Sequence, residues 1–295
     1  LEPTSGSSGG VKLIPYTKSL KEQYINAIFP WLVDLYKNFP ELLNGSAYWS
    51  ISPVGSIRQE ISSKVPIGFE DDSNYLGFIG KFMQKIFIAP KFLKEVTSQY
   101  DFSFITSYLL LQNRNLVLFS VWNPTFLLLL LSFIKNNFKL LLKEIDKPEY
   151  LLQLQHTYKW LKDIIKPNPN RSIELHKINK DSNHFVWSKV WPKLRLISCW
   201  DEGASFTYSQ KLKDFFPKVY FQGKGLLATE GIVSFPVFKA KGSVLAYKSH
   251  FFEFMNEDGN LYLAHQLKEG QKCEVIITTG GGLYRYRLGD IIEVT

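Results

Sequence analysis

The first twelve residues carry side chains suited to binding a polyphosphate. The sequence TSGSSGG runs from Thr4 to Gly10, and Lys12 follows two positions later. Glycine lets the backbone approach a ligand closely, successive amide N–H groups can form a concave nest for an anion, and the hydroxyls add donors. Lys12 is not followed by Ser or Thr, so the segment is not a Walker A loop. It is a candidate phosphate loop of another kind, with a flexible linker as the alternative.

A second candidate segment lies at 223–231, with the sequence GKGLLATEG. It follows a predicted strand at 218–222 and places Thr229 and Glu230 in a turn. A carboxylate in that position could hold a Mg²⁺ ion that bridges phosphate oxygens. The alternative is a surface turn with one solvated glutamate.

A third candidate segment is YRYRLGD at 284–290, which alternates as a strand does. Its tyrosines and leucine would share one face and its arginines the other. We expect Gly289 to turn the chain and to present Asp290, which could accept hydrogen bonds from ribose hydroxyls. An ordinary β-turn aspartate is the alternative. The nearby FFEF at 251–254 predicts a strand with Glu253 on its solvent face.

Hydrophobic periodicity and turn residues predict the elements that position these segments. Helices are expected at 18–39, 74–88, 98–111, 150–165 and 205–216, with a further helix beginning at 124. Strands are expected at 47–52, 116–121, 193–200, 218–222, 233–238, 251–255, 261–264, 274–279 and 283–288. Pro30 should kink or divide the first helix, whereas Asn123 and Pro124 form a start signal for another. Asp258-Gly259 indicates a hairpin, and 55–73 reads as an irregular polar loop. Crossover units come first and strands dominate later, which predicts an α/β fold.

Composition narrows the class of protein. The 295 residues are 45% hydrophobic, enough for a large core in one or two domains. Cys199 and Cys273 have neither disulfide-scaffold nor zinc-site spacing, so we expect reduced core cysteines in a cytoplasmic protein. The net charge of +8 is spread along the chain, which does not favour a nucleic-acid partner. The apolar run at 126–131 follows Asn123-Pro124 and is too short to cross a bilayer.

The motifs TSGSSGG, ATEG and YRYRLGD, in this order, resemble the signature of adenylate-forming enzymes. Four strings are similar to one branch of that superfamily, the auxin-responsive acyl acid amido synthetase family and its bacterial relatives. They are YRYRLGD, FFEF, PIGFEDDSNYLG at 66–77 and SVWNPTFLLLLL at 120–131. The resemblance implies the large N-terminal domain of the luciferase-like fold, in mixed sheets flanked by helices. It covers essentially the whole chain, as a crossover portion at 1–192 and a strand-rich portion at 193–295. It also implies that an upstream segment and a small C-terminal domain are absent, so the fragment itself would be inactive.

The same resemblance implies the reaction and the site residues. Members of the family use ATP and Mg²⁺ to adenylate a carboxylic acid, and an amino acid amine then attacks to give an amide. The residues that would bind the ATP phosphates are Thr4, Ser5, Gly6, Ser7 and Ser8. In the segment Ala228–Glu230, Thr229 and Glu230 would lie at the α-phosphate and its Mg²⁺, and Asp290 would hold the ribose. Where plant members carry a tyrosine shortly before this glutamate, the present chain has Leu226-Leu227.

The acyl pocket is sought at the ends of the predicted buried strands, where clefts form in α/β sheets. Trp122 and Asn123 follow one such strand and Trp200 follows another. The alternative for both tryptophans is a place in the core. Two other functions stay open at this point. One is adenylation with a thiol acceptor, as in CoA ligases, and the other is a non-catalytic nucleotide- or anion-binding module.

Overall fold

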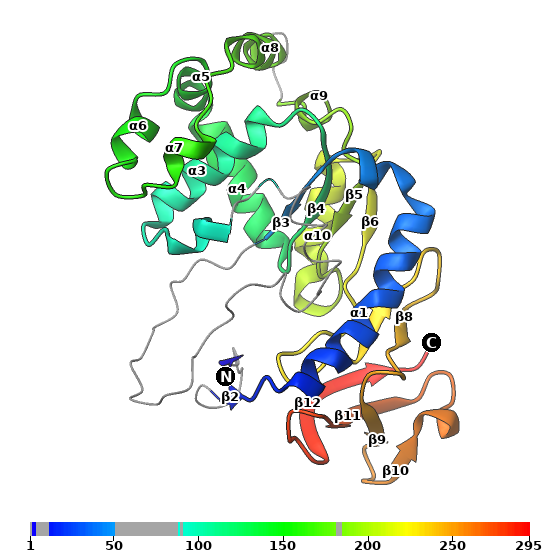
Figure 1. Cartoon of the computed structure of the whole chain (residues 1–295). Helices are drawn as coiled ribbons and strands as arrows, with labels where there is room; N and C mark the ends of the chain where they lie inside the picture. The colour runs from blue at the N-terminus through cyan, green and yellow to red at the C-terminus, as the bar shows by residue number, and fades with distance from the viewer. Residues whose placement is uncertain (1, 4–11, 51–87, 89–90, 181–184) are drawn as a thin grey trace. The chain divides into compact units, whose positions relative to one another are not determined.

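A computed structural model of the chain describes residues 2–3, 12–50, 88, 91–180 and 185–295 (Figure 1). The described residues form two compact units. The first unit contains 2–3, 12–38 and 224–295, and the second contains 39–50, 88, 91–180 and 185–223. The expected phosphate loop, the polar loop at 55–73 and nearly all of the helix expected at 74–88 lie outside the described residues. Both units thus combine segments that are far apart in the sequence.

The second unit is built on a four-stranded parallel sheet. Its strands are β3 (Ser46–Trp49), β4 (Leu116–Ser120), β5 (Leu196–Ser198) and β6 (Tyr220–Gln222), in the spatial order β3-β4-β5-β6. Every residue of β4 is buried, as expected of a central parallel strand covered on both faces. The strands at 196–198 and 220–222, assigned from sequence to the strand-rich portion, thus belong to the parallel sheet. Strand β5 is also shorter than the strand expected at 193–200.

Helices surround this sheet, and those coloured green gather at one end of the unit (Figure 1). They are α3 (Gln99–Gln112), α4 (Pro124–Asn136), α5 (Phe138–Asp146), α6 (Tyr150–Leu154), α7 (Leu161–Ile164), α8 (Pro169–Lys180), α9 (Trp187–Val190) and α10 (Phe206–Phe215). Short 3-10 helices occur at η1 (Pro40–Asn44), η3 (Lys91–Glu95) and η4 (Gly203–Ser205). The single helix expected at 150–165 is wrong, because the chain turns between α6 and α7. Glu144 accounts for the start of α6, since its buried carboxylate accepts N–H groups from Glu149, Tyr150 and Leu151.

Helix α4 begins where the sequence predicts. The Asn123 side chain accepts hydrogen bonds from the backbone N–H and the hydroxyl of Thr125, at 2.9 and 2.7 Å, and Pro124 occupies the first turn. This arrangement satisfies a donor that helix ends leave unpaired. The cap sets the direction in which α4 leaves the carboxyl end of β4. Trp122 and Asn123 are held in that connection.

The first unit joins a long helix to a four-stranded antiparallel sheet. Helix α1 (Lys18–Asn38) continues past Pro30, so the expectation that Pro30 divides this helix is wrong. The sheet has the order β10-β9-β11-β12, with β9 (Phe251–Met255), β10 (Leu261–Leu263), β11 (Lys272–Thr278) and β12 (Tyr286–Glu293). Two smaller pairs are β1 (Glu2–Pro3) with β2 (Leu13–Ile14) and β7 (Ser234–Pro236) with β8 (Ser243–Leu245). The 3-10 helix η5 spans Ala264–Gln266.

The antiparallel sheet buries alternate side chains of its strands in a small core. Phe252, Phe254, Val275 and Ile277 are 5% exposed or less and pack together in this core. The Asp258-Gly259 hairpin is confirmed, since β9 and β10 pair across it and Gly259 has a φ of 82°. This core supports the inner faces of β9, β11 and β12, and β12 carries Tyr286 and Asp290 of the candidate site.

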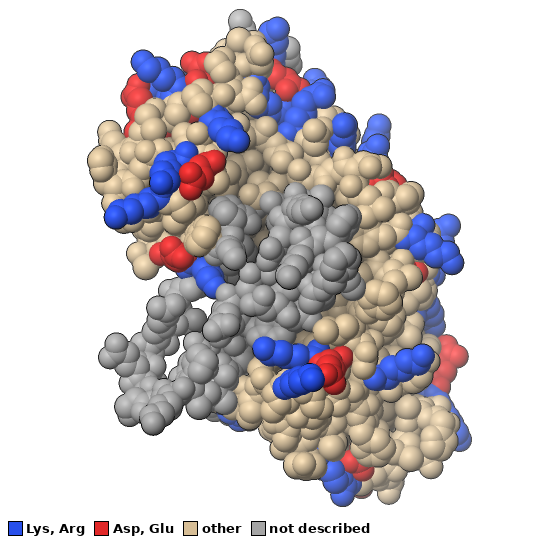
Figure 2. All heavy atoms as spheres, in the orientation of Figure 1, with Lys and Arg blue, Asp and Glu red and all other residues tan. Residues whose placement is uncertain are grey.

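Three remaining sequence expectations concern membrane-spanning helices, the distribution of charge and the two cysteines. Among the described residues, no single helix has the length and apolar character needed to cross a membrane; α4 and α5 meet that test only as a pair, bent by 75° at their junction. Positive side chains are dispersed over the face shown in Figure 2, with acidic and uncharged residues between them. Both cysteines are buried and neither forms a disulfide.

Candidate nucleotide-binding site

The turn at 228–231 holds Thr229 and Glu230 in the first unit. It is closed by two backbone hydrogen bonds, from Ala228 N to Gly231 O at 3.1 Å and from Gly231 N to Ala228 O at 3.2 Å. The Thr229 carbonyl oxygen lies 2.8 Å from the Tyr24 hydroxyl and 2.9 Å from the Tyr16 hydroxyl, both of which are donors. The turn is therefore fixed from the side of helix α1, and Glu230 projects from a restrained loop.

A line of hydrogen bonds joins Glu230 to the amino-terminal segment. Lys12 Nζ donates to the Tyr286 hydroxyl at 3.0 Å, and that hydroxyl donates to Glu230 Oε1 at 3.2 Å. The pKa of Lys12 is raised, first by its hydrogen bond to Tyr286 and also by the negative charge of Glu230. The site thus places an ammonium group and a carboxylate at opposite sides of one phenol. Residues 4–8, the predicted phosphate loop, lie outside the described residues.

Asp290 is near enough to Glu230 for that negative charge to contribute to its raised pKa, and it reaches this place in a way the sequence did not predict. Strand β12 continues through Asp290 to Glu293, so the expected turn at Gly289 is wrong. Instead the pairing of β11 with β12 shifts between Glu274 and Ile276, and Gly289 has a φ of 82°, which glycine adopts at low cost. Such a β-bulge redirects the side chains around it. The pKa of Asp290 is raised, mainly by burial and also by the charge of Glu230.

The arginines of YRYRLGD lie on the face opposite Tyr286, as predicted. Arg285 forms an ion pair with Glu253 of β9 at 3.0 Å, and Arg287 pairs with Glu274 of β11. Hydrogen bonding from the Arg287 side chain is the main reason that the pKa of the Glu274 carboxyl is lowered. Tyr284 departs from the prediction, because it precedes β12 and is 80% exposed. The arginines therefore brace the outer face of the sheet, and Tyr286 faces the site.

Two buried contacts of this unit, made by Gln23 and His250 near the Glu230 turn, were not predicted from the sequence. His250 is 6% exposed and accepts a hydrogen bond on Nε2 from the backbone N–H of Ile232, at 3.2 Å. Its Nδ1 lies 3.1 Å from Gln23 Oε1, which also accepts from the backbone N–H of Gly280 at 2.7 Å. Burial lowers the pKa of His250 to about 4. The sequence gives no signal that these two residues meet. His250 is a lone histidine before FFEF, and Gln23 is a polar residue on an amphipathic helix.

The donor set of this site suits magnesium shared with phosphate. Within the part of the chain that the structure describes, no three His, Cys, Asp or Glu side chains gather closely enough to hold a metal ion together. Magnesium needs fewer protein ligands than that, because it keeps waters and binds one or two carboxylates plus phosphate oxygens. Glu230 provides hard oxygen ligands, and a bound cation would offset its negative charge, which contributes after burial to the raised pKa of Asp290. The residues present therefore fit a Mg²⁺–nucleotide complex.

The candidate acyl-pocket residues lie in the second unit, at the carboxyl ends of β4 and β5. The indole rings of Trp122 and Trp200 have centroids 5.9 Å apart, and Trp200 N donates to Trp122 O at 2.9 Å. They are 38% and 37% exposed, so neither is a core aromatic. Asn123 caps α4 through its side chain. Next to these residues, Ser120 and Ser198 form a buried register pair at the ends of β4 and β5.

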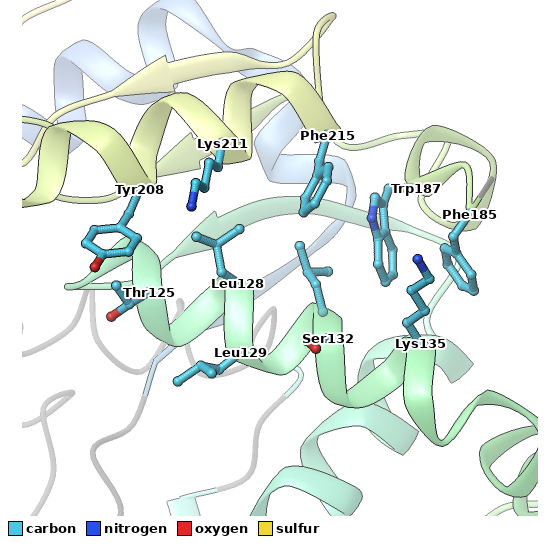
Figure 3. Close-up of a pocket in the computed structure, with 11 residues that line it drawn as sticks. Thr125, Leu128, Leu129, Ser132, Lys135, Phe185, Trp187, Tyr208, Lys211 and Phe215 are labelled. Atoms are coloured by element: carbon cyan, nitrogen blue, oxygen red, sulfur yellow. The ribbon is translucent and has the colours of Figure 1, made fainter.

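A separate hollow lies on the same unit between α4 and α10 (Figure 3). Its volume is about 690 Å³, and its walls are mostly apolar with two lysines. The lining residues are Thr125, Leu128, Leu129, Leu131, Ser132, Lys135, Phe185, Trp187, Tyr208, Lys211 and Phe215. Leu129 is 67% exposed, so the hollow is an open groove. None of the residues predicted from sequence for the site lines it.

Comparison with known structures defines the class of protein by its fold. The chain superposes on the AtGH3.15 acyl acid amido synthetase in complex with 2,4-DB with a TM-score of 0.79, at 21% identity, over 99% of this chain and 53% of that one. A second GH3.15 acyl acid amido synthetase structure gives a TM-score of 0.76 at 18% identity. The fold is that of the acyl acid amido synthetases, which confirms the fold class expected from the sequence.

Family models identify the family. The model of the GH3 family N-terminal domain matches residues 1–221, and that of the GH3 family central domain matches residues 243–295. The chain belongs to the GH3 family. It is 29% identical over 160 residues to the indole-3-acetic acid-amido synthetase GH3.10 of Arabidopsis thaliana, covering 45% of this chain and 27% of that protein. It is 28% identical over 147 residues to the jasmonoyl-L-amino acid synthetase JAR6 of Nicotiana attenuata, covering 44% and 25%. The chain spans about half the length of the AtGH3.15 chain.

Proposed function

We propose that the complete protein is an ATP-dependent ligase that joins a carboxylic acid to an amino acid. In the first step a carboxylate oxygen of the acid attacks the α-phosphorus of ATP, and the bond to pyrophosphate breaks. In the second step the amine attacks the acyl carbon, AMP leaves, and the amine loses a proton. Membership of the GH3 family and the amido synthetase fold support this proposal.

The observation that carries the proposal is the hydrogen-bonded line from Lys12 through Tyr286 to Glu230, with Asp290 beside it. Attack of a carboxylate on a phosphate brings two anions together, so catalysis depends on charge neutralisation and positioning. An ammonium group, a phenol and a restrained carboxylate meet that need without a nucleophilic side chain.

We assign Glu230 to holding Mg²⁺ at the α-phosphate, with Thr229 and Ala228 shaping the turn against that phosphate. Bound magnesium would supply charge neutralisation and orientation of the phosphate oxygens. Asp290 would accept hydrogen bonds from the ribose hydroxyls, and Lys12 would approach the phosphates. The predicted contribution of Thr4, Ser5, Gly6, Ser7 and Ser8 to the phosphates is part of the same proposal.

We place the acid at the exposed tryptophan pair, Trp122 and Trp200. Two tilted indoles provide an apolar surface with limited conformational freedom, which suits the non-polar part of an organic acid. Asn123 is already engaged as the helix cap, so we assign it an indirect role, in which it fixes Trp122. The buried, disulfide-free cysteines are compatible with the cytoplasmic setting proposed from the sequence.

The test is exchange of labelled pyrophosphate into ATP, dependent on an added carboxylic acid, measured on the complete natural protein with a panel of acids. Exchange with at least one acid is expected, and Glu230→Ala should lower it by roughly 100-fold or more, since it removes a proposed metal ligand. Glu257→Ala, in the exposed hairpin, serves as the matched control. Absence of exchange across the panel would overturn the proposal. Product analysis with amino acid and thiol acceptors then distinguishes an amide-forming from a thioester-forming enzyme.

A further inference from the structure

A buried link of side chains connects the Glu230 turn, helix α1 and the loop that leads to Tyr286. Ile232 N–H donates to His250 Nε2, His250 Nδ1 lies against Gln23 Oε1, and Gln23 Oε1 accepts from Gly280 N–H. We call this the His250 link. It includes none of the residues proposed to touch ATP, Mg²⁺ or the acid.

The partners fix the protonation of the imidazole. Because Nε2 accepts a backbone N–H, the proton of the neutral ring lies on Nδ1, which donates it to Gln23 Oε1. The Gln23 oxygen then accepts two hydrogen bonds, which its two lone pairs allow. A protonated imidazole would present an N–H to the Ile232 amide and lose that contact.

Packing leaves the link little room to adjust. A Cβ atom added at Gly231 would lie 2.9 Å from His250 Nε2, and a Cβ at Gly280 would press on Ser19. The Tyr24 ring packs edge-on against His250 with centroids 6.2 Å apart, and its hydroxyl donates to the Thr229 carbonyl. The backbone on both sides of Glu230 is thereby tied to α1.

The other end of the link holds the chain before Tyr286. Thr17 Oγ1 donates to Gly280 O at 2.7 Å, so both backbone groups of Gly280 are bound to the α1 segment. Thr279 N donates to Leu283 O and closes the loop that leads into β12. The Glu230 turn and the loop that leads to Tyr286 thus share one support.

We propose that His250 and Gln23 are positioning residues that set the Glu230 carboxylate against the Tyr286 hydroxyl. This inference rests on the proposed function for its catalytic consequence. Neither residue contacts a reacting atom, and both act through the backbone of 231–232 and 280. Residues that orient a metal ligand without touching the metal typically change metal affinity or activity by 10- to 100-fold.

Variants that preserve or remove single contacts test the proposal in the complete natural protein. His250→Leu removes both contacts of the ring, whereas His250→Gln keeps an acceptor that can reach the Ile232 amide. Gln23→Leu removes the shared acceptor, and Gln23→Glu keeps it. His265→Leu is the matched control, since His265 is exposed in η5.

For the leucine variants we expect the kcat of ATP–pyrophosphate exchange to fall roughly 10- to 100-fold, with a higher Mg²⁺ requirement and an unchanged KM for the acid. His250→Gln and Gln23→Glu should recover most of the lost rate. The double leucine variant should lose little more than either single one, because both act through one link. Folded leucine variants with wild-type kcat and Mg²⁺ dependence would overturn the proposal while leaving the proposed function intact.

Measurements that do not depend on activity separate this inference from the function. In the wild-type protein, nitrogen NMR should show His250 as the Nδ1–H tautomer, and the Ile232 and Gly280 amides should be protected from hydrogen exchange. Gln23→Leu should expose the Gly280 amide, and a crystal structure of His250→Leu should show Glu230 displaced from Tyr286. These measurements test the positioning role of His250 and Gln23 even if the protein has no exchange activity. An unchanged Glu230–Tyr286 contact in the variant structure overturns the positioning role.

Discussion

The Tyr286 hydroxyl donates a hydrogen bond to Glu230 at 3.2 Å and accepts one from Lys12 at 3.0 Å. One phenol therefore orients a proposed metal ligand and receives a cation that follows the predicted phosphate loop. This relationship joins the three sequence motifs that first indicated a nucleotide site, through residues 12, 230 and 286.

Replacing Tyr286 with phenylalanine removes the shared hydroxyl and leaves the ring in place. We expect kcat for ATP–pyrophosphate exchange to fall roughly 10- to 100-fold, since a hydrogen bond to a charged group is worth about 1.5 to 3 kcal/mol. Tyr284→Phe is the matched control, because Tyr284 is 80% exposed. Equal rates for the two variants would remove Tyr286 from the mechanism.

Replacing Glu230 with glutamine tests the charge interaction between Glu230 and Asp290. The pKa of Asp290 is raised in the folded state, so between its unfolded and folded pKa values the native protein binds more protons than the unfolded chain. The free energy of unfolding therefore falls as pH rises from the unfolded pKa of Asp290 through its folded pKa. Glu230→Gln should lower the pKa of Asp290 in an NMR titration. It should also increase the free energy of unfolding at pH 7, by on the order of 0.5 kcal/mol. An unchanged titration of Asp290 would contradict this arrangement.

Acid should destabilise the protein through His250. The pKa of this residue is about 4 in the folded state, below its ordinary value of 6.5, so the unfolded chain binds more protons between these values. The contribution of neutral His250 to the free energy of unfolding is fully present above pH 6.5 and is lost as pH falls toward 4, for a total of about 3 kcal/mol. Urea unfolding at a series of pH values measures it. His250→Gln should flatten this dependence, His265→Gln should not, and equal slopes for both would refute the assignment.

Shortening Trp200 tests the proposed acyl surface. Trp200→Ala should raise the KM for the acid roughly 10-fold and leave the KM for ATP unchanged, because it removes one of two paired indoles. Phe206→Ala, which truncates another exposed aromatic side chain in the same unit, is the control. A rise in the KM for ATP alone would move Trp200 from the acid to the nucleotide.

Local signals predicted the elements that local interactions control. The Asn123-Pro124 start of α4 depends on atoms within three residues, so the sequence was sufficient to place it. Alternation in YRYRLGD placed Arg287 correctly on the outer face, because period-two patterning reflects the strand itself. Arg285 precedes the strand, with a φ of 49°, so alternation does not account for its position. The same reasoning failed at Gly289, where a glycine compatible with a turn instead forms a bulge inside a continuing strand.

Contacts between distant segments could not be predicted in this way. Gln23 and His250 are separated by 227 residues and meet only because α1 packs against the loops of the antiparallel sheet. The Tyr24 hydroxyl likewise donates to the backbone carbonyl of Thr229, 205 residues further along the chain. These side chains have no motif of their own, so their roles become visible only when the fold brings them together.

Helix α1 is anchored near both ends, since Asp34 accepts a hydrogen bond from Phe238 N at 2.8 Å and Gln23 holds the opposite part. With 21 residues it is about 31 Å long at 1.5 Å per residue. Such a rod behaves as a lever. Lys18 is 16 residues, or about 24 Å, from Asp34, so pivoting the helix by about 2.5° at Asp34 would move its first turn by about 1 Å. A displacement of that size costs an enzyme on the order of 100-fold when it misaligns reacting groups. We therefore expect substitutions near β7 that displace the Asp34 end of α1 to shift the carboxylate of Glu230 as well.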